Sequence, residues 1–148
     1  TFDSSEYLNS LANSEICIAV SWSSDYAIAM ARARAAGLTL NLAFTVPKEG
    51  ANRTYSALMI PVGAPHLDAA YRFLEYMLQP QVIAAVTNDI YYGNDNLAAS
   101  RYVSPWILAD PTLYPTAAMR ARLYASDEVG IAVGRLRTRT WTRIKTGH

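Results

Sequence analysis

Residues Ile16–Tyr26, ICIAVSWSSDY, join an apolar run to a polar bend and to the start of a helical pattern. The stretch begins with a short continuous apolar run, Ile16–Val20, which is typical of a strand buried on both faces. The polar bend that follows carries Trp22 and Asp25, and a helical pattern resumes after it. Ligands of open α/β sheets bind at the carboxyl ends of strands, so this position favours a ligand site. A core tryptophan and a helix-capping aspartate explain the same pattern, and the local sequence leaves both interpretations open.

The composition limits the class of protein. A chain of 148 residues, 51% of them apolar, is long enough for one domain with a core. A net charge of +1 gives no overall attraction to nucleic acid or to an anionic membrane. The single cysteine, Cys17, can form no internal disulfide, and its apolar neighbours predict a small buried hydrophobe. No apolar run reaches transmembrane length, and Thr1 opens directly onto a helical pattern, so we expect this end to be an internal cut.

Hydrophobic periodicity predicts three strands and a longer series of helices. The predicted strands are Ile16–Ser21, Leu38–Val46 and Tyr55–Pro61, with a polar break at Pro47–Arg53. The predicted helices are Ser4–Asn13 with Ser4 as its cap, Ser24–Ala36, His66–Leu78, Pro80–Asn88, a partly helical Leu97–Leu108, Thr116–Tyr124 and Ile131–Lys145. The helix after His66 should bury Leu67, Ala70, Tyr71, Leu74, Met77 and Leu78. The order indicates an α/β domain whose sheet is short of strands, which fits a piece of a chain better than a complete doubly wound fold.

Catalysis and metal binding find little support in the sequence. The histidines, His66 and His148, stand in no Ser/His/Asp or Cys/His setting, and no metal-ligand spacing or nucleotide-binding glycine motif occurs. We therefore predict no enzymatic activity, no cofactor and no metal. Arg135, Arg139 and Arg143 form a basic stripe that could track phosphates, but a solvated or acid-paired helix face explains it better, and nucleic acid is not an expected partner.

Trp22, Asp25 and the pair Tyr91 and Tyr92 are the residues that most suggest a ligand. Aromatic faces attract ammonium groups, and a carboxylate pairs with them directly. Such a set suits an organic cation. Because aromatic residues also fill cores, the pattern alone keeps a structural role open.

Four blocks of the sequence carry a resemblance to a known family. They are SSEYLNSLANSEICIAVSWSSD, TVPKEGA, AYRFLEYMLQPQVIAAVTNDIYYGNDNLAA and RLRTRTWTRIKTG. In order and spacing, over essentially the whole chain, they resemble the C-terminal portion of periplasmic polyamine-binding proteins of ABC transporters. The resemblance implies a partial type II, two-lobed binding-protein fold, with a few strands flanked by several helices. It assigns about 1–50 to lobe 2, about 51–98 to a segment that crosses to lobe 1, and about 99–148 to a helical C-terminal segment.

The same resemblance implies a function. The family captures putrescine, spermidine or a related organic cation in the periplasm by closing two lobes over it, and delivers it to an ABC permease of the inner membrane. Further expected partners are the missing N-terminal part of the same protein and a second copy of the fragment. The alternative is a binding-protein fold with a degenerate cleft that acts in sensing or protein interaction.

The resemblance also implies a set of ligand-binding residues. Trp22 and Asp25 match the family's W-x-x-D motif, and Tyr92 matches a tyrosine of the cleft. After PKEGA the family usually has an aromatic residue, one more residue and an Asp, whereas this chain has Thr54 and Ser56 at those places. Loss of one buried charge partner costs about 2–5 kcal/mol, which is roughly thirty-fold to several thousand-fold in affinity. Either another residue supplies the charge, or the ligand has one charged end for Asp25 and one polar end for Ser56.

Overall fold

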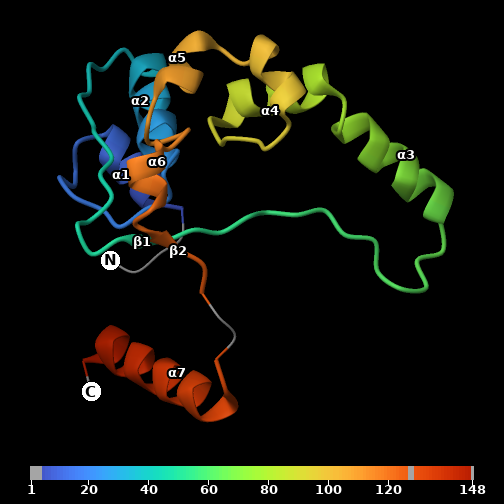
Figure 1. Cartoon of the computed structure of the whole chain (residues 1–148). Helices are drawn as coiled ribbons and strands as arrows, with labels where there is room; N and C mark the ends of the chain where they lie inside the picture. The colour runs from blue at the N-terminus through green and yellow to red at the C-terminus, as the bar shows by residue number, and fades with distance from the viewer. Residues whose placement is uncertain (1–4, 127–128, 148) are drawn as a thin grey trace.

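The structure, a computed structural model, describes residues 5–126 and 129–147. It is rich in helix and contains one small parallel sheet (Figure 1). The elements in chain order are α1 (Tyr7–Ala12), α2 (Asp25–Ala35), β1 (Ala51–Asn52), α3 (Leu67–Met77), α4 (Pro80–Ile90), the 3-10 helix η1 (Leu97–Tyr102), α5 (Pro105–Ala109), α6 (Ala117–Arg120), β2 (Leu123–Tyr124) and α7 (Ile131–Thr146).

The predicted helices are confirmed where their end signals are local. Gly37, with φ +75°, follows α2, and Pro80 occupies the first turn of α4. Thr116 caps α6, since its side chain accepts a hydrogen bond from the backbone N–H of Met119. That helix ends at Arg120 and does not reach Tyr124, because the residues beyond it enter β2. The predicted cap Ser4 and the terminal His148 lie outside the described residues.

The three predicted strands are wrong in this structure. Ile16–Ser21, Leu38–Val46 and Tyr55–Pro61 have no regular secondary structure, and Val20 and Met59 are exposed by 102% and 85%. Cys17, predicted to be buried with the first strand, is exposed. A strand needs a neighbouring strand to accept and donate its backbone hydrogen bonds, and no described segment pairs with these three.

The observed sheet joins two places where no strand was predicted. β1 pairs with β2 in parallel, Ala51 opposite Leu123, and the ladder extends through the N–H of Arg53, which donates to the carbonyl of Tyr124 at 2.8 Å. Gly50 enters β1 with φ +97°, and a Cβ there would lie 2.2 Å from the carbonyl oxygen of Arg122. Glycine is therefore required where the two segments approach each other.

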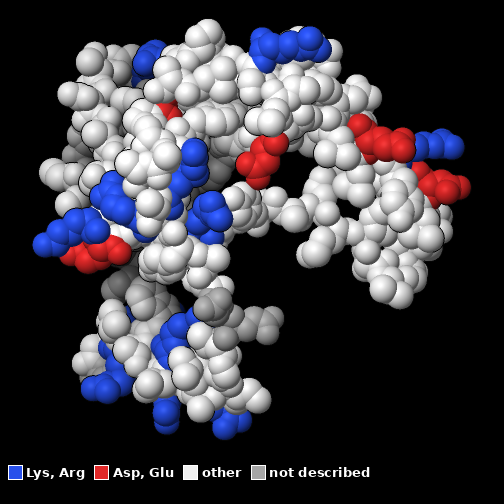
Figure 2. All heavy atoms as spheres, in the orientation of Figure 1, with Lys and Arg blue, Asp and Glu red and all other residues white. Residues whose placement is uncertain are grey.

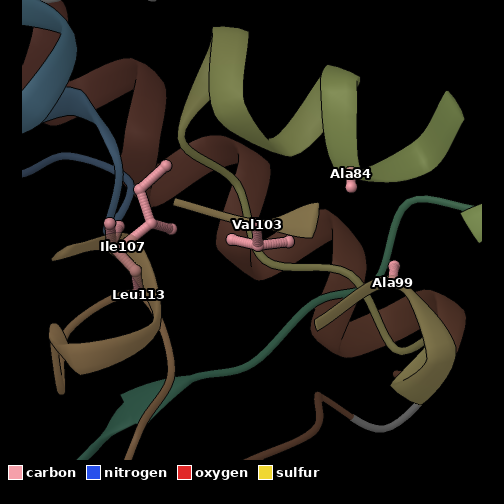
Figure 3. Close-up of a cluster of buried hydrophobic side chains, with 5 residues drawn as sticks. All are labelled: Ala84, Ala99, Val103, Ile107 and Leu113. Carbon is pink, nitrogen blue, oxygen red and sulfur yellow. The ribbon is translucent and has the colours of Figure 1, made fainter. Parts of the chain in front are cut away.

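Among the described residues, two small apolar clusters form the core. The first cluster joins α4, η1, α5 and the turn after it, and in Figure 3 Ala84 of α4 faces Ala99 of η1; it consists of Ala84, Ala99, Val103, Ile107 and Leu113. The second cluster joins α1 and α2 through Leu8, Leu11 and Ala29. Tyr26 of α2 packs against the first cluster, so α2 connects the two.

Helices α3 and α7 keep their apolar faces exposed. The prediction that α3 buries its apolar residues is wrong, since none of them is buried and Tyr71 is exposed by 58%. No described element covers this face of α3, which extends away from α4 (Figure 1). Helix α7 likewise has no buried residue. Its basic stripe is exposed, and Figure 2 shows lysine and arginine side chains over the surface of this helix.

Candidate functional site

A buried carboxylate is the centre of the candidate site. Asp25 opens α2 and is only 3% exposed. Its Oδ2 accepts hydrogen bonds from the backbone N–H of Trp22, at 2.9 Å, and from the hydroxyl of Tyr7 in α1. Its Oδ1 lies 3.4 Å from the hydroxyl of Tyr92. A buried carboxylate requires such donors, because burial removes the water that would otherwise solvate it.

The two oxygens of Asp25 differ in how fully they are used. An ionised carboxylate offers about four lone-pair positions. Oδ2 has two donors, whereas Oδ1 has one long contact with the Tyr92 hydroxyl. Oδ1 therefore retains the capacity to accept a further donor, such as an ammonium group.

Tyr92 contributes a neutral hydroxyl next to this carboxylate. Burial raises the pKa of its phenol, the nearby Ser24 hydroxyl lowers the pKa in part, and the negative charge of Asp25 raises it again. The phenol thus keeps its proton at neutral pH and acts as a hydrogen-bond donor. Tyr92 as a whole remains 37% exposed, so part of this residue is open to solvent.

The loop after α4 holds Tyr92 in place. Tyr91 ends α4 in a left-handed conformation, with φ +61°, and its ring lies 5.4 Å from that of Trp106. The side-chain amide of Asn94 donates to the hydroxyl of Thr87, at 2.8 Å, and Thr87 is buried. Tyr91 therefore packs against the core, while its neighbour Tyr92 is directed toward Asp25.

Trp22 lies at the edge of the site and is 56% exposed. The interpretation of Trp22 as a core residue is therefore wrong. Asp25 does have a structural role, since it accepts the N–H of Trp22 and so closes the bend before α2. This structural role is compatible with ligand binding, because the hydrogen bond from Trp22 uses Oδ2 and not Oδ1.

Thr54 and Ser56 are not brought into this site. Both are exposed, in the extended segment that runs from β1 toward α3 (Figure 1). Within the described part of the chain, no hydrogen bond joins either residue to Asp25, Trp22 or Tyr92. Their part in ligand binding stays a prediction.

Sequence reasoning missed two features of the site. No sequence pattern indicates that Tyr7 belongs to the site, because it lies on a separate helix and reaches Asp25 only through the packing of α1 on α2. The second feature is a contact between the Tyr26 hydroxyl and Asp110. Asp110 also accepts the N–H and the hydroxyl of Thr112 on its Oδ1, at 2.8 and 2.7 Å. The spacing of Asp110 and Thr112 is typical of an Asx-turn and could have been recognised.

The described residues offer a limited range of chemistry. Within residues 5–126 and 129–147, no group of three or more His, Cys, Asp and Glu side chains is placed to hold a metal ion. In the same ranges, no helix is long and apolar enough to cross a membrane. The site at Asp25 combines one carboxylate, two phenols and an indole, which suits a cationic ligand.

Comparison with known proteins identifies the family. Residues 2–116 match the family of bacterial extracellular solute-binding proteins. The chain is 40% identical over 146 residues to the putrescine-binding periplasmic protein PotF of Escherichia coli K12. This match covers 99% of this chain and 40% of PotF. The chain is 34% identical over 146 residues to the putrescine-binding periplasmic protein SpuD of Pseudomonas aeruginosa UCBPP-PA14, with the same shares. It is 30% identical over 131 residues to a spermidine/putrescine-binding periplasmic protein of Escherichia coli K12, or 88% of this chain and 36% of that protein.

These similarities confirm the resemblance to polyamine-binding proteins. The chain spans about 40% of the length of the curated relatives it matches. A helix-rich chain with a small parallel sheet is consistent with part of a binding-protein fold. The chain belongs to the family of bacterial extracellular solute-binding proteins.

Proposed function

We propose that this chain supplies part of the ligand cleft of a periplasmic binding protein that captures a polyamine or a related organic cation for an ABC importer. The observation that carries the proposal is the buried carboxylate of Asp25, which accepts the backbone N–H of the exposed Trp22 and lies beside the hydroxyl of the partly exposed Tyr92. The relatives named as putrescine-binding periplasmic proteins support the choice of ligand class and compartment.

The chemistry of capture follows from the geometry at Asp25. An ammonium group binds at Oδ1, where the only described donor is the distant Tyr92 hydroxyl. At an effective dielectric constant of about 20, two unit charges about 4 Å apart attract by about 4 kcal/mol before the cost of desolvation. The methylene chain of the amine then lies against the faces of Trp22 and Tyr92, which exclude water from the ion pair. The role is binding and release, with no bond made or broken.

The remaining parts of the proposal concern a protein of the relatives' length. In it, the fold is two-lobed and of type II, with about 1–50 in lobe 2, about 51–98 crossing to lobe 1 and about 99–148 as the C-terminal segment. The apolar faces of α3 and α7, exposed in this chain, are covered there by further polypeptide. Lobe closure over the cation creates the form that the permease of the inner membrane recognises.

Thr54 and Ser56 set the expected ligand apart from a simple diamine. Asp25 binds one charged end of the ligand, and position 56 is a serine and not a carboxylate that could bind a second charged end. A ligand with one ammonium group and one polar group, the latter bound by the Ser56 hydroxyl, suits this arrangement. Putrescine is then a weaker ligand than it is for a protein that has both acids.

Calorimetry on a chimera tests the proposal. In the chimera this chain replaces the 146 matched residues of PotF, and putrescine, spermidine and spermine are titrated in turn. We expect binding of at least one amine, and a loss of roughly thirty-fold or more in affinity for Asp25→Asn. The matched control is Asp89→Asn, an exposed carboxylate on α4, which should change affinity less than about two-fold. No heat with any amine would contradict the polyamine assignment.

A further inference from the structure

A second tyrosine–carboxylate contact involves the residue that follows Asp25 in the chain. Tyr26, which follows Asp25 in α2, donates its hydroxyl to Oδ2 of Asp110 at the end of α5. Both oxygens of Asp110 are in use, since Oδ1 accepts the N–H and the hydroxyl of Thr112. Asp110 thus fastens the first turn of α2 to the turn formed by residues 110–114.

The same turn supports the loop that carries Tyr92. Leu113 is buried in the first cluster, and a Cβ at Gly93 would lie 3.1 Å from its carbonyl oxygen. The hydroxyl of Tyr114 lies 3.4 Å from the N–H of Asn94, which donates to it. The turn of residues 110–114 therefore contacts α2 on one side and the Tyr92 loop on the other.

We propose that Asp110 is a positioning residue that sets the spacing between Asp25 and Tyr92, and thereby the affinity of the cation site. The inference rests on the proposed function only for its effect on ligand binding. The claim that Asp110 sets the spacing between Asp25 and Tyr92 concerns the structure of this chain alone, and we call it the structural half of the inference. A binding site has to hold its groups within about 0.5 Å, and such precision depends on the residues that support them.

The contacts separate this role from direct ligand binding. Both oxygens of Asp110 accept short hydrogen bonds from Tyr26 and Thr112, so its carboxylate already serves contacts inside the chain. Its influence on the site passes through the Tyr26 side chain, one residue from Asp25. Loss of the Tyr26 contact frees the first turn of α2 to move relative to the loop of Tyr92.

The structural half is tested by NMR on the whole chain, with tyrosine rings labelled by carbon-13. The first readout is the pH titration of the Tyr92 phenol, and the second is the nuclear Overhauser contact between the Tyr92 ring and the protons of Asp25. Asp110→Ala and Tyr26→Phe should each weaken this contact and shift the Tyr92 titration toward that of an ordinary tyrosine. Asp110→Asn keeps an oxygen that accepts from Tyr26, and it should restore the contact.

Asp89→Ala is the matched control, because it removes an exposed carboxylate from α4, the helix that leads to the Tyr92 loop. It should leave both readouts unchanged. The inference is overturned if Tyr26→Phe, which removes a single hydroxyl and preserves the fold, leaves the contact and the titration of Tyr92 as they were.

Ligand affinity distinguishes this inference from the proposed function. In the PotF chimera, Tyr26→Phe should weaken amine binding about ten-fold, as the loss of one supporting hydrogen bond implies, and Asp110→Ala, which removes the acceptor of three hydrogen bonds, should weaken it at least as much. If Asp25→Asn abolishes binding while these two variants bind normally, the positioning role is refuted and the cation site stands. If Asp25→Asn binds normally, the proposed function fails, whatever the NMR readouts show.

Discussion

Removal of the Asp25 carboxylate should destabilise the chain, because two donors lose a charged acceptor in a buried place. The backbone N–H of Trp22 lies 2.9 Å from Oδ2, and the hydroxyl of Tyr7 contacts the same oxygen. Asp25 is 3% exposed in the unaltered chain, so its place is nearly closed to solvent. In Asp25→Ala both donors remain there, and water replaces the lost acceptor only in part. The hydroxyl of Tyr92 lies 3.4 Å from Oδ1, so it loses only a weak hydrogen bond.

The magnitude follows from these contacts. A hydrogen bond to a charged group contributes about 1.5–3 kcal/mol, so two such bonds contribute about 3–6 kcal/mol. Removing the carboxylate also removes the cost of burying it, which reduces the net loss to about 2–4 kcal/mol. Asp25→Asn keeps one acceptor oxygen and should lose about half as much. For a chain of this length, 2–4 kcal/mol corresponds to a fall of about 4–16 °C in Tm.

Urea denaturation followed by far-ultraviolet circular dichroism measures the free energy of unfolding for each variant. Asp89→Ala is the control and should stay within about 0.5 kcal/mol of the unaltered chain. A value for Asp25→Ala within the same margin would show that the buried carboxylate contributes no net stability through Trp22 and Tyr7, contrary to this prediction.

Three further predictions follow from other residues. Because burial raises the pKa of Tyr92, the stability that its neutral hydroxyl contributes is present below the ordinary tyrosine value and is lost as the pH rises through the raised pKa. Stability measured against pH should therefore fall less steeply in this alkaline range for Tyr92→Phe, and an equal slope would contradict this. Gly50→Ala should cost about 2–3 kcal/mol in urea denaturation, because its methyl group meets the Arg122 carbonyl at φ +97°, and a cost below about 0.5 kcal/mol would contradict it. Ser56→Asp in the PotF chimera should strengthen putrescine binding by roughly thirty-fold or more, and unchanged affinity would show that the position does not face the ligand.

The helices could be predicted because their signals are local. Gly37 and Pro80 mark the end of α2 and the start of α4 within a few residues of each element. A piece of a larger fold is expected to expose some apolar surface, but periodicity could not identify α3 and α7 as the helices that do so, because it shows which residues form a face and not whether another element covers it.

The strands failed for a related reason. Val20 is apolar and lies in a strand-like run, yet a strand forms only where another segment pairs with it. The pairing of Ala51 with Leu123 depends on contacts between distant segments and has no local signal. An apolar run therefore indicates that a segment favours the strand conformation, whereas the presence of a pairing segment determines whether a strand forms.

The candidate site was partly predictable. The strand-end pattern and the family resemblance singled out Trp22, Asp25 and Tyr92, and the structure places the Asp25 carboxylate next to Trp22 and Tyr92. Tyr7 and Asp110 came only with the structure, because each acts through a hydrogen bond between separate helices or turns.

A crystal structure of the PotF chimera, grown with the amine that binds it most tightly, tests directly whether Asp25 is the cation-binding group. We predict an ammonium nitrogen within hydrogen-bond distance of Oδ1 of Asp25, with the methylene chain of the ligand between the rings of Trp22 and Tyr92. An amine bound elsewhere, with the Asp25 carboxylate still satisfied by Tyr7, Trp22 and Tyr92 alone, would contradict the assignment of this carboxylate as the cation-binding group.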